Sequence, residues 1–164
     1  MRKPRIDSGA ALSAAVFFAA RASALAARRG LSFPDEVDVE FCGDRASAAA
    51  HFSSMGVRGA TDVITLRYEA SPPFPSRGEL IVNPVEAARA AAARGTQAGP
   101  ALLPEEADLP WSAGAELALY VAHGFDHLAG SDDSTASGFR AMRRRELRWL
   151  AAFASCRGLP EFFR

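Results

Sequence analysis

The stretch WSAGAELALYVAHGFDHLAG, residues 111–130, predicts the helix on which the fold is built. Ser112 is a suitable N-cap, because its hydroxyl can accept a hydrogen bond from an N–H group of the first turn. Gly130 is typical of the position at which a helix ends. Between them, small and apolar residues recur at helical spacing at Leu117, Tyr120, Val121 and Gly124. We therefore expect this face to pack against the rest of the protein.

Two histidines of this helix, His123 and His127, are four residues apart and share one helical face. Their Cβ atoms are then about 6 Å apart, so both imidazoles can be directed at one point. Beyond Gly130 the chain can double back, which allows a carboxylate oxygen of Asp133 to complete a set of three ligands. Two histidines and a carboxylate with an open fourth position are typical of a catalytic zinc site, although iron and manganese accept the same donors. We predict a site for one zinc ion; the alternative is a pair of partly exposed histidines on a helix surface.

The remaining chain interleaves predicted strands with predicted helices. The strands are rich in β-branched residues or alternate apolar with polar residues, and they cover VDVEFC (37–42), TDVITLRYE (61–69) and ELIVN (79–83). The other predicted helices are a first one that stops at Arg29, a short one from the N-cap Asp44 to Ser53, one from Pro84 to Gly95, and a last one over residues 138–154. Residues 96–110 contain three prolines and predict a surface loop that helps to shape a cleft. We expect a single α+β domain over residues 1–164, with a small mixed β-sheet packed with helices and the metal site at the end of a helix.

The N-terminus has two interpretations. A basic start followed by a largely apolar run from Ala10 to Ala20 resembles a secretory signal. Against this, Asp7 and Arg21 interrupt the pattern, and residues at helical spacing form one stripe at Ala11, Ala14, Ala15, Phe18, Ala22 and Leu25. We favour an amphipathic first helix packed on a sheet. The apolar run is expected to be too short for a bilayer, which needs ~20 apolar residues, and no membrane partner is expected.

Net charge and cysteine content narrow the function classes. The formal net charge is zero at pH 7, so RNA or another polyanion would have to be met by a local basic patch. The last predicted helix offers such a patch at Arg140, Arg143, Arg144, Arg145 and Arg148. The alternative for these residues is an ordinary solvated helix face. Cys42 and Cys156 form no CxxC pair, which predicts free thiols in a reducing compartment and a cytoplasmic protein.

These motifs resemble those of the YbeY family of endoribonucleases, which act in the maturation of ribosomal RNA. HGFDHLAGSDD (123–133) is similar to the family signature H-G-x-L-H-L-x-G-Y-D-H, and TDVITL (61–66) resembles the family strand T-D-V-L-S-F. GELIVNPVEAARAAA (78–92) resembles the family's G-D-I-V-I-x-P strand and the helix after it. In the family three histidines bind one zinc ion. The resemblance therefore assigns zinc to His123, His127 and Asp133, with Asp133 at the position of the third histidine.

Further departures from the family pattern bear on the site. The family's arginine before the T-D-V strand falls on Met55, so we expect Arg58 to offset charge in the transition state, the alternative being an ordinary loop arginine. A family asparagine falls on His51 and a family serine on Thr65. Asp126 replaces a leucine close to a ligand. We expect Asp126 to accept a hydrogen bond from a ligand histidine or to carry a proton; the alternative is a solvent-facing aspartate.

The resemblance implies a zinc-dependent endoribonuclease that is specific for single strands and acts in ribosomal RNA maturation and ribosome quality control. Its implied partners are ribosomal RNA, the ribosome and ribosome-associated proteins. One alternative is a non-catalytic factor that binds RNA or the ribosome and keeps the metal for structure. A metalloprotease-like hydrolase is less favoured, because its helical motif has glutamate directly after the first histidine, where this chain has Gly124.

Overall fold

A three-stranded sheet forms the base of the molecule. The computed structural model describes residues 6–94, 106 and 111–157. Within them the strands are β1 (Glu36–Phe41), β2 (Val63–Tyr68) and β3 (Arg77–Val82), arranged in the order β1-β3-β2. β1 runs parallel to β3, and β2 runs antiparallel to it, with Val39 and Thr65 both opposite Leu80. The predicted small mixed sheet is confirmed.

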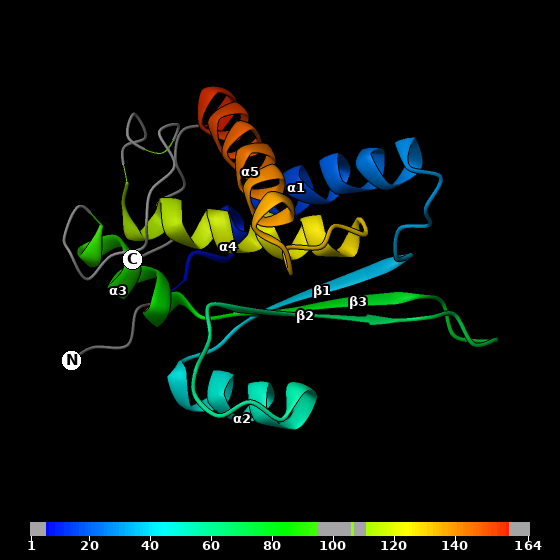
Figure 1. Ribbon diagram of the computed structural model, residues 1–164, viewed down its shortest axis with the longest axis horizontal. Coiled ribbons are helices and arrows are strands. Elements are labelled where there is room, and N and C mark those ends of the chain that lie inside the picture. Colours follow the sequence, from blue (N-terminus) through cyan, green and yellow to red (C-terminus); the bar gives the residue numbers. More distant parts are fainter. Residues whose placement is uncertain (1–5, 95–105, 107–110, 158–164) are drawn as a thin grey trace.

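Helices lie on both sides of this sheet (Figure 1). The described residues form α1 (Ser8–Arg28), α2 (Asp44–Met55), α3 (Pro84–Ala93), α4 (Ala113–Leu128) and α5 (Ala136–Arg157). Figure 1 shows α4 along one face of the sheet, with α1 and α5 beyond it and α2 on the opposite side. The α+β class is confirmed. The predicted surface loop over residues 96–110 lies outside the described residues, apart from Glu106, which is buried.

Capping residues determine where the helices begin. Ser112 caps α4 as predicted, because its side chain accepts a hydrogen bond from the Ala115 N–H at 3.1 Å. The prediction of Asp44 as the N-cap of α2 is wrong. Gly43 occupies the cap position, and Asp44 is the first residue of the helix. The Asp44 carboxylate instead accepts a hydrogen bond from the side-chain amide of Asn83 at 2.9 Å, which ties α2 to the start of α3.

Two glycines let α4 lie directly against β3. A Cβ atom at Gly124 would lie 2.6 Å from Leu80 Cδ2, and a Cβ atom at Gly78 would lie 2.7 Å from Leu128 Cδ1. Each glycine thus accommodates a buried leucine of the other element. Because Gly124 directly follows His123 in the sequence, this close contact also fixes the distance between the histidine-bearing helix and the sheet.

The substitution Gly124→Ala is expected to lower the free energy of unfolding by about 1–3 kcal/mol, because the added methyl group overpacks the contact with Leu80. This loss should appear even though alanine is the better helix former. Urea denaturation measures the change. Gly43→Ala is the matched control, since a Cβ atom there meets nothing within 4 Å. Equal stability of the two variants would contradict the close contact.

The first helix, α1, packs on other helices and not on the sheet. The predicted stripe is buried except for Ala15, which is half-buried. Its contacts are with α4 and α5, so the expected packing against a sheet is wrong. The expectation that the run is too short for a bilayer is also wrong, because the 21 residues of α1 are long and apolar enough to cross a membrane by length and composition.

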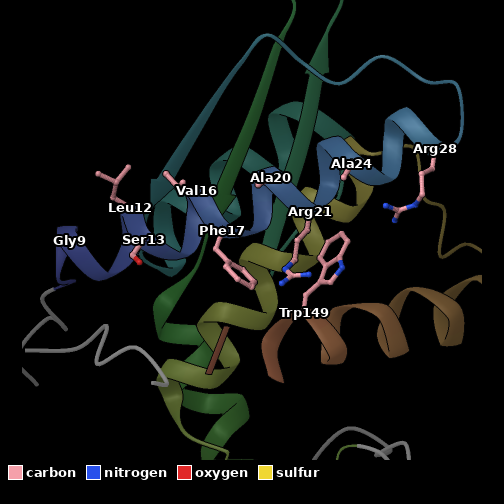
Figure 2. Close-up of a pocket in the computed structure, with 10 residues that line it drawn as sticks. All are labelled: Gly9, Leu12, Ser13, Val16, Phe17, Ala20, Arg21, Ala24, Arg28 and Trp149. Atoms are coloured by element: carbon pink, nitrogen blue, oxygen red, sulfur yellow. The ribbon is translucent and has the colours of Figure 1, made fainter. Parts of the chain in front are cut away.

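The outer face of α1 borders a groove of about 720 Å³ (Figure 2). Leu12 and Val16 are 65% and 62% exposed on this helix. Figure 2 shows Phe17 and Arg21 on the side of α1 that faces Trp149 of α5. The Arg21 guanidinium lies over the Phe17 ring, with its Cζ atom 4.3 Å from the ring centroid. α1 therefore has apolar residues both on its buried inner face and on its exposed outer face.

Candidate metal centre

His123, His127 and Asp133 meet at the C-terminal end of α4. The two histidine Nε2 atoms are 3.1 Å apart. Asp133 Oδ2 lies 3.6 Å from His123 Nε2, and Asp133 Oδ1 lies 3.7 Å from His127 Nε2. The side chains of the two histidines and the aspartate are 17%, 28% and 35% exposed, respectively. The three predicted ligands therefore surround one point that solvent can reach.

The opposite ring nitrogens show which histidine atoms are free to bind an ion. His123 Nδ1 lies 2.7 Å from a carboxylate oxygen of Glu146, and His127 Nδ1 lies 3.1 Å from the carbonyl oxygen of Ser131. Because these oxygens only accept hydrogen bonds, both Nδ1 atoms must carry a proton and donate it. In the neutral rings the Nε2 lone pairs then face each other. Two such acceptors at 3.1 Å need a proton or a cation between them.

The separations between the donor atoms fit a divalent cation. Tetrahedral coordination with bonds of about 2.0–2.2 Å places ligand atoms roughly 3.3–3.6 Å apart. Here the two Nε2 atoms are 3.1 Å apart, and different oxygens of the Asp133 carboxylate lie 3.6 Å from His123 Nε2 and 3.7 Å from His127 Nε2. Two imidazoles and a carboxylate are donors that zinc, iron and manganese accept. The group of His123, His127 and Asp133 could therefore hold one metal ion.

A turn after α4 brings the third ligand to the histidines. Gly130 has a φ of 81°, in the left-handed region that glycine adopts without strain. This turn reverses the chain and carries Asp133 back to the end of α4. The neighbouring Asp132 is engaged elsewhere, because its carboxylate accepts hydrogen bonds from the N–H and hydroxyl of Ser134 at 2.9 and 2.7 Å. Of the two adjacent aspartates, Asp133 is thus the one in the cluster.

The prediction that Asp126 accepts a hydrogen bond from a ligand histidine is wrong. Its carboxylate is fully buried and accepts three hydrogen bonds from the Arg145 guanidinium, at 3.1, 2.9 and 3.0 Å. The Ser131 hydroxyl donates a fourth hydrogen bond to it at 2.5 Å. Burial raises the pKa of Asp126, and the hydrogen bonds from Arg145 and Ser131 oppose that rise. Asp126 therefore anchors the turn to α5 and does not orient a ligand.

Glu146 takes the orienting role, although it is absent from the residues predicted from the sequence. It is completely buried, and its contact with His123 Nδ1 is the kind that fixes the orientation of a ligand imidazole and makes it a better metal donor. The sequence contains a weak signal for this role of Glu146. Glu146 interrupts an apolar stripe of α5 that is buried at Met142, Leu150 and Phe153.

The predicted arginine face of α5 is divided among different environments. Arg145 is bound to Asp126, so its predicted place on a face that binds RNA is wrong. Arg143 is half-buried and forms ion pairs with Glu106 and Glu146 at 3.9 and 3.6 Å. The other three side chains of the run are exposed, at Arg140, Arg144 and Arg148.

A pocket of about 260 Å³ lies beside the two histidines, and Arg58 does not line it. Its lining residues are Met55, Val63, Thr65, Arg67, His123, His127 and Leu128. Arg58 lies on an exposed loop, with its guanidinium carbon 5.8 Å from the centroid of the Phe52 ring. Met55, which the sequence resemblance aligns with the family's arginine, is thus part of the pocket wall. A catalytic role for Arg58 stays a prediction.

The pH dependence of metal binding follows from the surroundings of His123. Burial lowers the pKa of His123, but the Glu146 hydrogen bond and the charges of Glu146, Asp62 and Asp133 raise it more, so that it lies above its ordinary value of 6.5. Below this raised pKa a metal must displace a proton, and we expect metal affinity to rise by up to ~10-fold per pH unit before it levels off. Zinc titrations against a competing chelator at several pH values measure this rise.

The same proton stabilises the metal-free fold. Since the folded pKa of His123 is raised, this stabilisation is fully present below the pKa of the unfolded chain and is lost as the pH rises through the folded pKa. Metal-free protein should therefore lose stability over the pH range in which its metal affinity increases. A metal affinity that does not change with pH would contradict the raised pKa of His123, because no proton would then compete with the metal.

A family model and a relative of known name match this chain. The model of the family described as Endoribonuclease YbeY matches residues 11–154. The protein named Endoribonuclease YbeY of Rhodopirellula baltica is 37% identical over 87 residues. That alignment covers 53% of this chain but only 38% of the relative, so it spans well under half of the relative's length. Because the family model covers most of the chain, the protein belongs to the YbeY endoribonuclease family.

Proposed function

We propose that this protein is a metal-dependent endoribonuclease that hydrolyses phosphodiester bonds of single-stranded RNA. The observation that supports it most directly is the cluster of His123, His127 and Asp133, with both Nε2 atoms directed at one point next to a pocket. Membership of the YbeY family supplies the reaction class. A structural zinc site would use all four coordination positions for protein ligands, whereas this group supplies three.

The chain's own residues would divide the work as follows. His123, His127 and Asp133 hold the ion, which we propose to be zinc, and Glu146 keeps the His123 ring in its binding orientation. A divalent ion there supplies Lewis acidity toward a phosphoryl oxygen and acidifies a water molecule. Apolar residues of the pocket, Val63 and Leu128, limit the water around the reacting phosphate.

We propose ribosomal RNA as the substrate, with roles in ribosomal RNA maturation and ribosome quality control. The support is the resemblance of HGFDHLAGSDD and TDVITL to the family's motifs together with the match of the family model. A cytoplasmic location fits the two cysteines, both of which are free, with Cys42 half-buried and Cys156 exposed. We propose no membrane partner, in line with the buried inner face of α1.

Removal and return of the metal test the proposed function. Purified protein should contain about one zinc ion per chain and should cleave labelled single-stranded RNA in preference to a duplex. A chelator should stop cleavage without unfolding the protein, and zinc should restore it. Unfolding on chelation would favour a structural metal. A folded, zinc-loaded protein that binds RNA but never cleaves it would favour the non-catalytic factor, for which Met55 in the pocket wall is the motivating feature.

A further inference from the structure

A second cleft, of about 520 Å³, lies between α3, α4 and α5. Tyr120, which lines this cleft, lies three residues before His123 and therefore on the same face of α4. Arg143 also lines it, and the Arg143 Nε atom lies 3.6 Å from Glu146, the hydrogen-bond partner of His123. Glu146 thus links Arg143 of the cleft to His123 of the metal cluster.

The floor of this cleft is a buried network of opposite charges. Arg94 forms ion pairs with Glu116 and, at 3.5 Å, with Glu106. The side chains of Arg94, Glu106 and Glu116 are 6%, 5% and 2% exposed, respectively. The Arg94 guanidinium also stacks on Trp111, with its Cζ atom 3.2 Å from the ring centroid. The floor therefore sets one buried arginine against two buried glutamates, and the second positive charge near Glu106 is that of Arg143, 3.9 Å away.

The rim of the cleft is different, because it presents an aromatic ring next to an arginine with unused donors. Phe139 is 40% exposed, and the Arg143 Cζ atom lies 5.5 Å from its ring centroid. The ion pairs of Arg143 with Glu146 and Glu106 are 3.6 and 3.9 Å long. Both are longer than an N–H···O hydrogen bond of ~2.7–3.2 Å. Among the described residues Arg143 makes no hydrogen bond, whereas Arg145 makes several.

An exposed aromatic ring beside an available guanidinium is a surface suited to a nucleotide. Bases stack on aromatic side chains without regard to their identity, and this contact accounts for a large part of the affinity of many single-strand binders. An arginine with unsaturated donors can bind a phosphate through two parallel hydrogen bonds. Arg94 is enclosed in the floor by Glu106 and Glu116, which leaves the arginine at the rim as the group that receives the phosphate.

We propose that Phe139 and Arg143 form a nucleotide subsite beside the metal cluster, in which a base stacks on Phe139 and the adjacent phosphate binds Arg143. The subsite would hold the RNA segment that flanks the bond to be cleaved. This inference rests on the proposed ribonuclease function. It places the RNA contact of α5 at one arginine and one phenylalanine, and it assigns none to Arg145.

Binding of a short labelled single-stranded RNA to the zinc-loaded protein tests the subsite. The measurement is fluorescence anisotropy on ice, with the integrity of the RNA checked afterwards. Phe139→Ala is expected to weaken binding about 10-fold, and Phe139→Tyr should retain it. Arg143→Gln is expected to weaken binding and to flatten the slope of log affinity against log salt concentration by about 0.7, while Arg143→Lys keeps the slope. Phe74→Ala and Arg148→Gln, at exposed positions outside the cleft, are the matched controls.

The possible outcomes separate the subsite from the ribonuclease function. If wild-type protein does not bind the RNA, or if Phe139→Ala and Arg143→Gln bind as tightly as wild type, the subsite is wrong; cleavage by wild type would still support the nuclease. Weakened binding in a protein that cleaves nothing supports the subsite and refutes the nuclease. Loss of zinc from Arg143→Gln would show that Arg143 acts through Glu146, and this would overturn its contact with phosphate.

Discussion

Replacement of His127 by alanine is expected to remove the bound metal and to reduce RNA cleavage to background while the protein stays folded. His127 supplies one of three ligand atoms, and its Nε2 atom lies within 3.7 Å of both other donors. Loss of a ligand should exceed the ~10–100-fold loss of affinity that changes around the ligands cause. The variant should be stable, because the group left behind is the Ser131 carbonyl at a partly exposed site. Metal analysis, a cleavage assay and thermal unfolding measure the three expectations.

Three further variants test whether the effect of His127→Ala is specific to the metal site. Asp133→Ala should have the same phenotype, whereas His123→Ala should in addition lose stability, because it leaves the fully buried Glu146 without its imidazole partner. His51→Ala is the control for the removal of a histidine, since His51 binds the Gly59 carbonyl and stands outside the cluster. Equal zinc content and equal cleavage in His127→Ala and His51→Ala would refute the site.

The ligand set can be predicted from sequence because it is almost entirely local. His123 and His127 share a helical face whatever surrounds the helix, and Asp133 follows after a turn that Gly130 makes possible. Gly124 is recognisable in the same way as a packing position of the central helix, although its contact with Leu80 is not.

The sequence does not show which helices and strands contact one another. The stripe on α1 shows that one face is buried but not that α4 and α5 cover it in place of the sheet. The partner of His123 comes from α5, at Glu146, and the nearer carboxylate in sequence, Asp126, is neutralised by Arg145. Both assignments depend on how two helices meet, and side-chain spacing within either helix carries no information on that.

Replacement of Asp126 by alanine is expected to destabilise the protein by about 3–5 kcal/mol, because it leaves the largely buried charge of Arg145 without its anionic partner. The Asp126 carboxylate is 0% exposed and the Arg145 side chain 16% exposed. The Ser131 hydroxyl donates to Asp126 and accepts from Arg145 and from Arg29 at 2.9 and 2.8 Å, so the turn that carries Asp133 should loosen as well. Urea denaturation and zinc titration measure the two effects.

An exposed ion pair provides the matched control. Asp38 pairs with Arg77 on the surface, where the side chains are 63% and 52% exposed, so Asp38→Ala should cost no more than about 1 kcal/mol. Equal losses for Asp126→Ala and Asp38→Ala would show that the buried pair does not hold the turn. Replacing Asp126 by leucine and Arg145 by methionine together removes both charges and should recover most of the stability. If that double variant regains stability but not zinc affinity, the role of the Asp126–Arg145 pair is to position the turn that carries Asp133. The stability of the fold then does not depend on the pair.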